Sequence, residues 1–168
     1  SVWGALENPN LIRNIERVTL HKGRDGGVTW FLPRVCMVPQ AKGATALIGA
    51  SVCNHTPVVQ LLLARGARVD QADKDGDNAL ILTSATGKTE TVEALLRGRA
   101  YVNTQNKNGI SPLVIASFQG HTAVVRLLLD RGANVNLRAV NGLTALSAAT
   151  TNGHPDIAEM LRNAGARN

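Results

Sequence analysis

The sequence has few aromatic residues and few cysteines, and each shortage narrows the class of protein. Aromatic side chains make up 3% of the 168 residues. Strands of a β-sandwich favour aromatic and β-branched residues, so this composition instead favours closely stacked helices, whose bulk comes from Ala, Leu and Val. The two cysteines, Cys36 and Cys53, are too few for a disulfide framework and indicate a reducing compartment.

Long apolar runs are also missing. No run approaches the roughly 18 apolar residues that a membrane-spanning helix needs, and the N-terminal residues do not form a signal peptide. We therefore expect a cytoplasmic protein without a membrane span. Export stays open at this stage, because Ser1 could be the first residue of a processed chain.

What the sequence does contain is one phrase that returns every 33 residues. The phrase appears as GATALIGAS, GDNALILTS, GISPLVIAS and GLTALSAAT. Its first residues are Gly43, Gly76, Gly109 and Gly142. Eleven residues after each of these comes a second recurring position, held by Asn54, Gly87, Gly120 and Gly153. A fixed period of this length indicates a stack of small units, which forms a long surface rather than a pocket.

One unit, residues 109–141, shows what each repeat predicts. Ser111 is a good N-cap, and Pro112 follows at the first helical position, where its missing N–H costs nothing. Gly120 ends this short helix, and a second helix with apolar residues at helical spacing runs to a C-cap glycine, Gly132. A polar stretch with turn residues completes the unit. Such a unit cannot bury its apolar face alone, so the units must stack.

These segments resemble ankyrin repeats. The shared pattern is G-x-T-A-L-x-x-A, then G-H, then V-V-x-L-L-L-x-x-G-A-x-V-N, and four repeats cover residues 41–168. The resemblance implies an all-α repeat solenoid of helix–turn–helix units with β-turn fingers. The usual T-P-L-H of the family appears here as TALI, NALI, SPLV and TALS, the TAL form resembling bacterial members. The family's histidine is therefore absent at this position, which puts its hydrogen bond between repeats in doubt.

The second repeat departs from the others at the end of its second helix. It has Arg99 where the other repeats have Gly66, Gly132 and Gly165, and Gly98 comes one residue earlier. An arginine in the left-handed conformation would cost about 1 kcal/mol. We therefore predict that this helix ends one residue early and that Arg99 avoids positive φ.

We expect a single domain over residues 1–168, with repeats at 43–75, 76–108 and 109–141 and a C-terminal capping repeat at 142–168. Arg162 in the last repeat replaces the leucine of the earlier ones, which gives the outer face the polarity that a terminal repeat needs. Residues 1–42 then form a divergent N-terminal cap that begins with a helix over about residues 9–19.

Residues 20–35 allow two interpretations. Apolar residues alternate on both sides of the glycine-rich stretch KGRDGG, which is typical of a short β-hairpin. Alternatively, residues 28–32 form the short second helix of the capping repeat. The repeat register favours the helix, because Pro33 to Val35 align with Gly66 to Arg68.

The sequence contains no pattern that predicts catalysis, a cofactor or a metal site. The aspartates Asp70, Asp73, Asp75 and Asp77 resemble a calcium loop. Counted from Asp73, however, Asn78 and Ser84 occupy the positions that need Gly and Glu. The histidines and cysteines have no recurrent zinc spacing, and G-x-S-x-G, P-loop and H-E-x-x-H motifs are missing. We expect no enzyme, no cofactor and no small-molecule substrate.

The net charge of +6 raises the question of a polyanionic partner. The charge is evenly spread: residues 1–42 carry six Lys or Arg and three Asp or Glu, and residues 43–168 carry twelve and nine. Four arginines recur near the ends of the second helices, where cations complement the helix dipole: Arg65, Arg97, Arg131 and Arg162. This favours solvated arginines and makes nucleic acid an unlikely partner.

The resemblance places partner-binding residues beside the first glycine of each unit and just before the second recurring position. In this sequence they are Lys74, Asp75, Asp77, Lys107, Asn108, Ile110, Phe118, Gln119, Val140, Asn141, Leu143 and Asn152. Ile110, Phe118, Val140 and Leu143 are larger and more apolar than the repeat requires, which is typical of a contact site. The alternative is that Ile110 and Phe118 pack on each other as local filler.

The sequence therefore predicts a monomeric, non-catalytic module that binds a partner protein through its concave face and so sequesters or inhibits it. The alternative is an electrostatic binder of nucleic acid or another anionic surface, which would use the net charge of +6.

Overall fold

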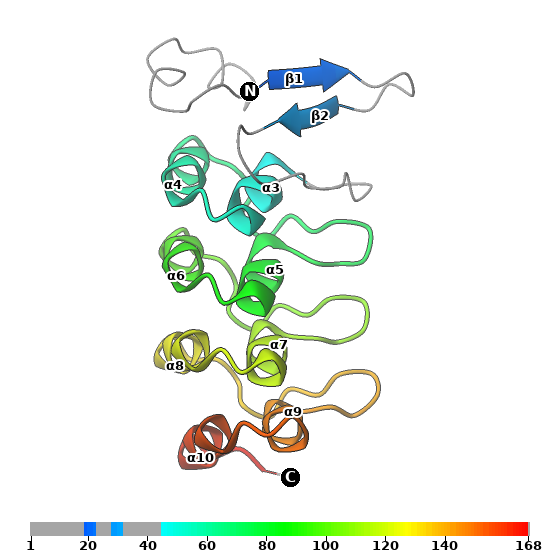
Figure 1. Cartoon of the computed structure of the whole chain (residues 1–168), viewed down its shortest axis with the longest axis vertical. Helices are drawn as coiled ribbons and strands as arrows, with labels where there is room; N and C mark the ends of the chain where they lie inside the picture. The colour runs from blue at the N-terminus through cyan, green and yellow to red at the C-terminus, as the bar shows by residue number, and fades with distance from the viewer. Residues whose placement is uncertain (1–18, 23–27, 32–44, 168) are drawn as a thin grey trace.

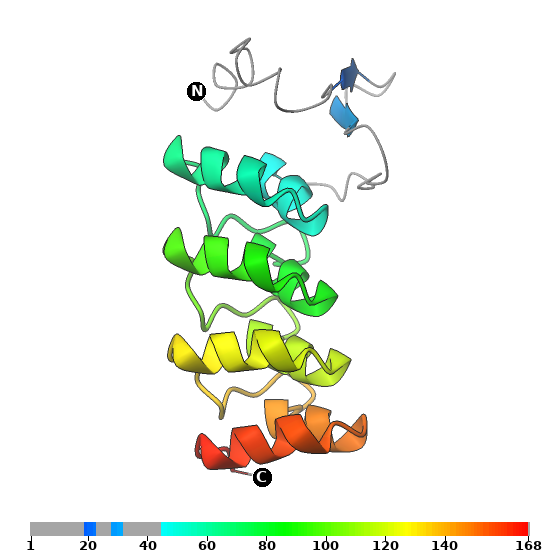
Figure 2. The same cartoon turned by 60° about the vertical axis from the view of Figure 1, so that its left-hand side comes forward.

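The computed structural model describes residues 19–22, 28–31 and 45–167. Within these residues the chain forms eight helices, arranged as four stacked pairs (Figures 1 and 2). The helices are α3 (Ala46–Val52), α4 (Thr56–Ala64), α5 (Ala79–Thr86), α6 (Thr89–Arg97), α7 (Pro112–Gln119), α8 (Thr122–Asp130), α9 (Ala145–Thr151) and α10 (Pro155–Asn163). The prediction of an all-α repeat solenoid is confirmed. None of the described helices is long and apolar enough to cross a membrane.

The first helix of each pair follows a capping residue, which in the third pair is the predicted Ser111. These residues have extended backbone dihedrals, and each side chain accepts a hydrogen bond from the backbone N–H three residues further on. The capping residues are Thr45, Asn78, Ser111 and Thr144. This local interaction satisfies one of the free N–H groups at the start of a helix. Each helix start is therefore determined by a short segment of sequence.

The helices form two layers with the core between them (Figure 1). The first helices α3, α5, α7 and α9 pack on one another in sequence, and the second helices α4, α6, α8 and α10 do the same. Leu80, Leu95, Leu113, Leu128 and Leu161 are fully buried where the layers meet. One apolar cluster runs through all four pairs, so each repeat is stabilised by burial against its neighbours.

A finger-like loop connects each pair to the next on the side of the first helices (Figure 1). Neighbouring fingers are joined by main-chain hydrogen bonds, from Lys107 N to Asp75 O at 3.1 Å and from Val140 N to Asn108 O at 2.9 Å. Gly109 at a finger tip has φ of 73°, and a Cβ there would lie 3.0 Å from Val140 N. Glycine is therefore required both by the left-handed backbone and by the close approach of the next finger.

The prediction that helix α6 ends early is wrong. Helix α6 ends at Arg97, in register with the end of α8 at Asp130, and Arg99 takes φ of 67°. Ala100 is almost fully buried, and its N–H donates to Leu95 O at 3.0 Å, as Ala133 N–H does to Leu128 O. This bond and the burial of Ala100 require the left-handed residue before it, and they outweigh its cost of about 1 kcal/mol.

Near the N-terminus two short strands pair antiparallel. They are β1 (Thr19–Lys22) and β2 (Val28–Phe31), with Thr19 opposite Phe31 and Lys22 opposite Val28. The interpretation of residues 28–32 as a short helix is therefore wrong over Val28–Phe31. The β-branched and aromatic residues of this stretch favour an extended backbone, and pairing with β1 satisfies its polar groups. The expected turn at residues 23–27 lies outside the described residues.

Other expectations for the N-terminal part remain untested. The helix over about residues 9–19 lies almost entirely outside the described residues, and so does most of the cap expected over residues 1–42. The boundaries given above for the individual repeats also stay a prediction.

Candidate functional site

The three described fingers each close into a tight turn. Backbone N–H groups donate from Asp73 to Asp77 O, from Asn106 to Ile110 O and from Ala139 to Leu143 O, at 2.9, 3.1 and 2.9 Å. In the middle finger, the side-chain Oδ1 of Asn106 also accepts the N–H groups of Asn108 and Ile110. Asp73 does the same for Asp75 and Asp77 in the preceding finger. The predicted binding residues at the tips are therefore held by a fixed backbone.

The side chain of Asp77 makes a hydrogen bond to the next finger. Its Oδ1 accepts a hydrogen bond of 2.8 Å from Nδ2 of Asn106 in the next finger. Burial raises the pKa of Asp77 above its usual value, the bond from Asn106 lowers it, and the charges of Asp73 and Asp75 raise it again. The net shift is upward. Asp77 thus joins two fingers, and Lys74 and Asp75 are the exposed members of the set in this finger.

The four apolar residues predicted as the centre of the contact differ in exposure. Phe118, near the end of α7, is 41% exposed, and Val140 is 82% exposed. Ile110 and Leu143 are only partly exposed, and both pack against the apolar core. Ile110 and Leu143 therefore help to hold the second and third fingers on the stack, and Phe118 and Val140 are the exposed members of the four.

The polar members of the predicted set are exposed as well. Lys107, Asn108, Gln119, Asn141 and Asn152 are all exposed. Two of them also stabilise the local backbone, because Asn141 Oδ1 accepts from Leu143 N at 3.1 Å and Asn152 Nδ2 donates to Ala148 O at 3.0 Å. Apolar anchors with a polar surround are the usual anatomy of a protein–protein contact.

Sequence analysis missed one exposed aromatic residue. Tyr101 is 61% exposed and lies in the loop between α6 and the next finger. Its N–H donates to Asp70 Oδ1 of the preceding repeat at 3.0 Å. Tyr101 lies neither at a finger tip nor at the end of a first helix, where the resemblance places binding residues. A signal was present: the repeat position of Tyr101 holds Arg68, Asn134 and Arg167 in the other units, all of them polar.

One of the two cysteines of the chain, Cys53, lies within the described residues. Cys53 is disulfide-bonded, and Cys36, the other cysteine of the chain, lies outside the described residues. Within the described residues, no group of three or more His, Cys, Asp or Glu side chains could hold a metal ion.

The architecture is that of a helical repeat protein whose units stack in one direction and carry fingers on one side. Comparison with protein-family models gives a match to "Ankyrin repeats (3 copies)" over residues 21–106 and 84–168. The chain belongs to the ankyrin repeat family. No curated protein matches it. Ankyrin repeats are in general protein–protein interaction modules and are typically not enzymes.

Proposed function

We propose that this chain is a non-catalytic, monomeric module that binds a partner protein through its finger face. The finger face consists of Lys74, Asp75, Lys107, Asn108, Ile110, Phe118, Gln119, Val140, Asn141, Leu143 and Asn152. The observation that supports the proposal is the exposure of two large apolar side chains, Phe118 and Val140, at positions where the repeat requires no apolar residue.

The finger face is well suited to binding because it is already ordered. The turns are closed by backbone hydrogen bonds, and neighbouring fingers are joined to each other. A rigid surface loses little conformational entropy when a partner docks, so more of the contact energy appears as affinity. Burial of the surface that is still exposed would contribute about 1 kcal/mol at Phe118, which is 41% exposed, and about 1.5 kcal/mol at Val140, which is 82% exposed.

The surface also suggests how the module would act on its partner. A stack of fingers covers an extended patch rather than a single side chain, so a bound partner is occluded over a wide area. We infer that binding sequesters the partner and inhibits it where the covered patch includes its own active or binding site.

The test is capture of a partner from a lysate of the source cells by the wild-type chain and by the double variant Phe118→Asp, Val140→Asp. We expect the double variant to lose capture, because two charges would be buried in the contact. Its thermal unfolding should change little, since both side chains are exposed in the free protein. Leu143 is unsuitable for this purpose, because it packs against the core.

Tyr101→Asp is the matched control. It places one negative charge, where the double variant places two, on an exposed aromatic residue outside the finger face, and it is therefore compared with each single variant as well. Capture that survives the double variant, or that is lost equally in the control, would contradict the proposed face.

A further inference from the structure

A second surface, made of arginines, runs along the edge where the second helices end. The arginine strip comprises Arg65, Arg68, Arg97, Arg99, Arg131, Arg162 and Arg167, all of them exposed. They lie at the C-terminal ends of α4, α6, α8 and α10 or in the turns that follow. Because these helices stack directly on one another, their ends form one continuous edge (Figure 2).

The composition of the strip is unusual for this chain. Its seven cations are all arginine, whereas the lysines within residues 45–167, Lys74, Lys88 and Lys107, lie elsewhere. The acidic residues near this edge are Asp70, Glu93, Asp130 and Glu159, and Arg126 holds the repeat position of Glu93 and Glu159, so eight positive and four negative charges leave a net charge of +4. Arginine presents a planar set of donors that matches phosphate oxygens in pairs, which lysine cannot do.

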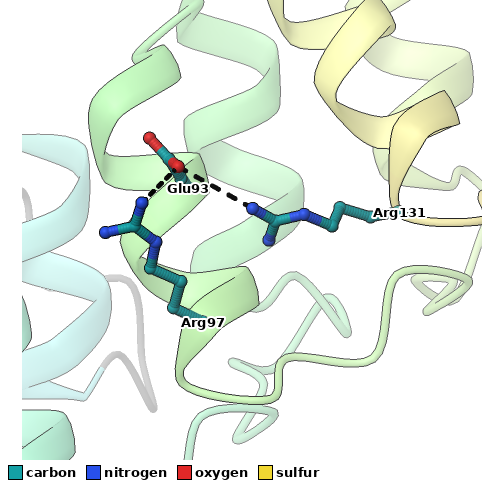
Figure 3. Close-up of polar contacts among 3 residues, drawn as sticks. All are labelled: Glu93, Arg97 and Arg131. Carbon is teal, nitrogen blue, oxygen red and sulfur yellow. Dashed lines mark hydrogen bonds and ion pairs between the residues drawn. The ribbon is translucent and has the colours of Figure 1, made fainter.

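The helix dipoles account for only some of the arginines in the strip. Arg97 and Arg162 lie in the last helical turn, and Arg65 and Arg131 are C-caps, where a cation complements the helix dipole. Glu93 holds two of these side chains, at 2.7 Å from Arg97 Nη2 and 3.7 Å from Arg131 Nη2 (Figure 3). Arg68, Arg99 and Arg167 lie beyond the helices, and the dipole gives no reason for them.

Arg99 is the most informative of the three. It has φ of 67° at a position where the other repeats have glycine, and its backbone strain is about 1 kcal/mol. Its side chain is exposed, and within the described residues it has no recorded ion pair or side-chain hydrogen bond. The burial of Ala100 explains the positive φ at this position but not the arginine, because glycine would take the same φ without strain; the retained side chain therefore points to a role in binding.

Tyr101 lies beside these loop arginines. It follows Arg99 by two residues, and its bond to Asp70 holds it next to the loop that carries Arg68. Its ring, in a side chain that is 61% exposed, is the one large aromatic group on this edge within residues 45–167. A cationic path with an exposed aromatic ring is the combination that binds single-stranded nucleic acid, since phosphates pair with arginine and a base stacks on the ring. A membrane surface would call for several exposed apolar side chains along the strip.

We propose that the arginine strip binds single-stranded nucleic acid, with Arg68 and Arg99 on phosphates and Tyr101 stacked on a base. The proposal is independent of the finger face. The probes are fluorescein-labelled oligouridine and oligothymidine of about 15 nucleotides, titrated with the full chain at low salt and followed by fluorescence anisotropy. The two probes distinguish RNA from DNA as the preferred strand.

The decisive variant is Arg68→Gln, Arg99→Gly, compared with Lys74→Gln, Lys107→Gln. Both remove two positive charges, but from different faces. We expect the arginine variant to weaken binding about tenfold or more and to reduce the salt slope by roughly 1.4, whereas the lysine control changes affinity less than about threefold. Tyr101→Ala should weaken binding at least about fivefold and leave the salt slope unchanged.

Four results would overturn the proposal. They are absence of binding by the wild-type chain, equal loss in the arginine and lysine variants, an unchanged affinity of Tyr101→Ala, and binding to phosphatidylserine vesicles but to neither oligonucleotide. The second would indicate a diffuse effect of net charge, the third a contact with phosphates alone, and the fourth a membrane surface. Thermal melts of every variant separate these results from loss of the fold.

Discussion

The imidazole of His121 occupies the space beside Gly87 of the preceding repeat. Its Nε2 lies 3.0 Å from the carbonyl oxygen of Ala85, and a Cβ on Gly87 would lie 2.6 Å from Nδ1 of the ring. His154 and Gly120 repeat the arrangement one unit further on. The hydrogen bond between repeats that the missing T-P-L-H histidine put in doubt is thus made by a different histidine.

The interface between the first and second repeats has neither the glycine nor the histidine. There the glycine position holds Asn54, with φ of 57°, and the histidine position holds Lys88. A different hydrogen bond joins these two repeats: Asn54 Oδ1 accepts from the hydroxyl group of Thr91 at 2.9 Å. In the three interfaces between described repeats, a side chain at the first position and a ring at the second do not occur together, because a Cβ at the first position would clash with the ring.

This relationship predicts the cost of Gly87→Ala. The variant must strain a left-handed backbone and also displace His121 from Ala85 O. Gly153→Ala is the matched control, since φ there is 74° and nothing lies within 4 Å of its Cβ. We expect the control to lose about 1 kcal/mol of unfolding free energy, and Gly87→Ala to lose about 1–3 kcal/mol more.

The measurement is urea denaturation of both variants. Adding His121→Ala to Gly87→Ala should recover part of the difference, because the ring that clashes is gone. Equal losses in Gly87→Ala and Gly153→Ala would show that the ring does not constrain this site.

Arg99→Gly should stabilise the protein. The substitution removes the left-handed strain of about 1 kcal/mol and keeps the backbone bond from Ala100 to Leu95. Arg65→Gly is the control, because Arg65 has an ordinary φ of −93° and glycine there only adds flexibility to the unfolded chain. In calorimetry the midpoint temperature of unfolding should be higher for Arg99→Gly than for the wild type and lower for Arg65→Gly. A lower midpoint for Arg99→Gly would contradict the proposed backbone strain at Arg99.

Ser84→Ala and Ser117→Ala should each be neutral or stabilising by up to about 1 kcal/mol. Both hydroxyl groups are fully buried, and their Oγ atoms have no hydrogen-bond partner. Removing a buried polar atom without a partner removes its desolvation cost. Ser111→Ala is the contrast, because its Oγ accepts from Val114 N as an N-cap. It should lose about 1 kcal/mol. A loss of similar size at all three positions would show that the buried hydroxyls have unseen partners.

The stability of the wild-type chain should depend on the titration of Asp77. Its folded-state pKa is raised, mainly by burial, so the folded protein binds this proton more tightly than the unfolded chain does. Stability therefore falls as the pH rises from the unfolded pKa of about 3.9 through the folded pKa. Asp77→Asn should remove this dependence and keep an oxygen that accepts from Asn106.

Denaturation of both proteins across the acidic range measures the effect. The advantage of Asp77→Asn over the wild type should grow with rising pH in this window. The opposite trend would mean that the pKa of Asp77 is lowered in the folded state. Asp156 contributes with the other sign in both proteins, because the hydrogen bond from Thr122 lowers its pKa, and it therefore cancels in the comparison.

Much of the fold follows from local rules that a sequence displays directly. The period of 33 residues, the capping residues at Thr45 and its equivalents, and the glycines at the finger tips each depend on a few neighbouring residues. Helix starts and left-handed turns are governed by the same short-range sterics and hydrogen bonds wherever they occur. The assignment to ankyrin repeats could therefore be made before any coordinates were known.

Other features depended on burial within the packed stack. Arg99 takes positive φ against its own preference, because Ala100 must be buried and its N–H must reach Leu95. Ile110 and Leu143 look like contact residues in the sequence, but in the structure both pack against the apolar core. Phe118, Val140 and Tyr101 are the large apolar or aromatic side chains that stay exposed within the described residues. The sequence alone determined the unit and its repetition through local geometry. Packing between units decided which side chains were left for a partner, because burial depends on neighbours distant in the chain.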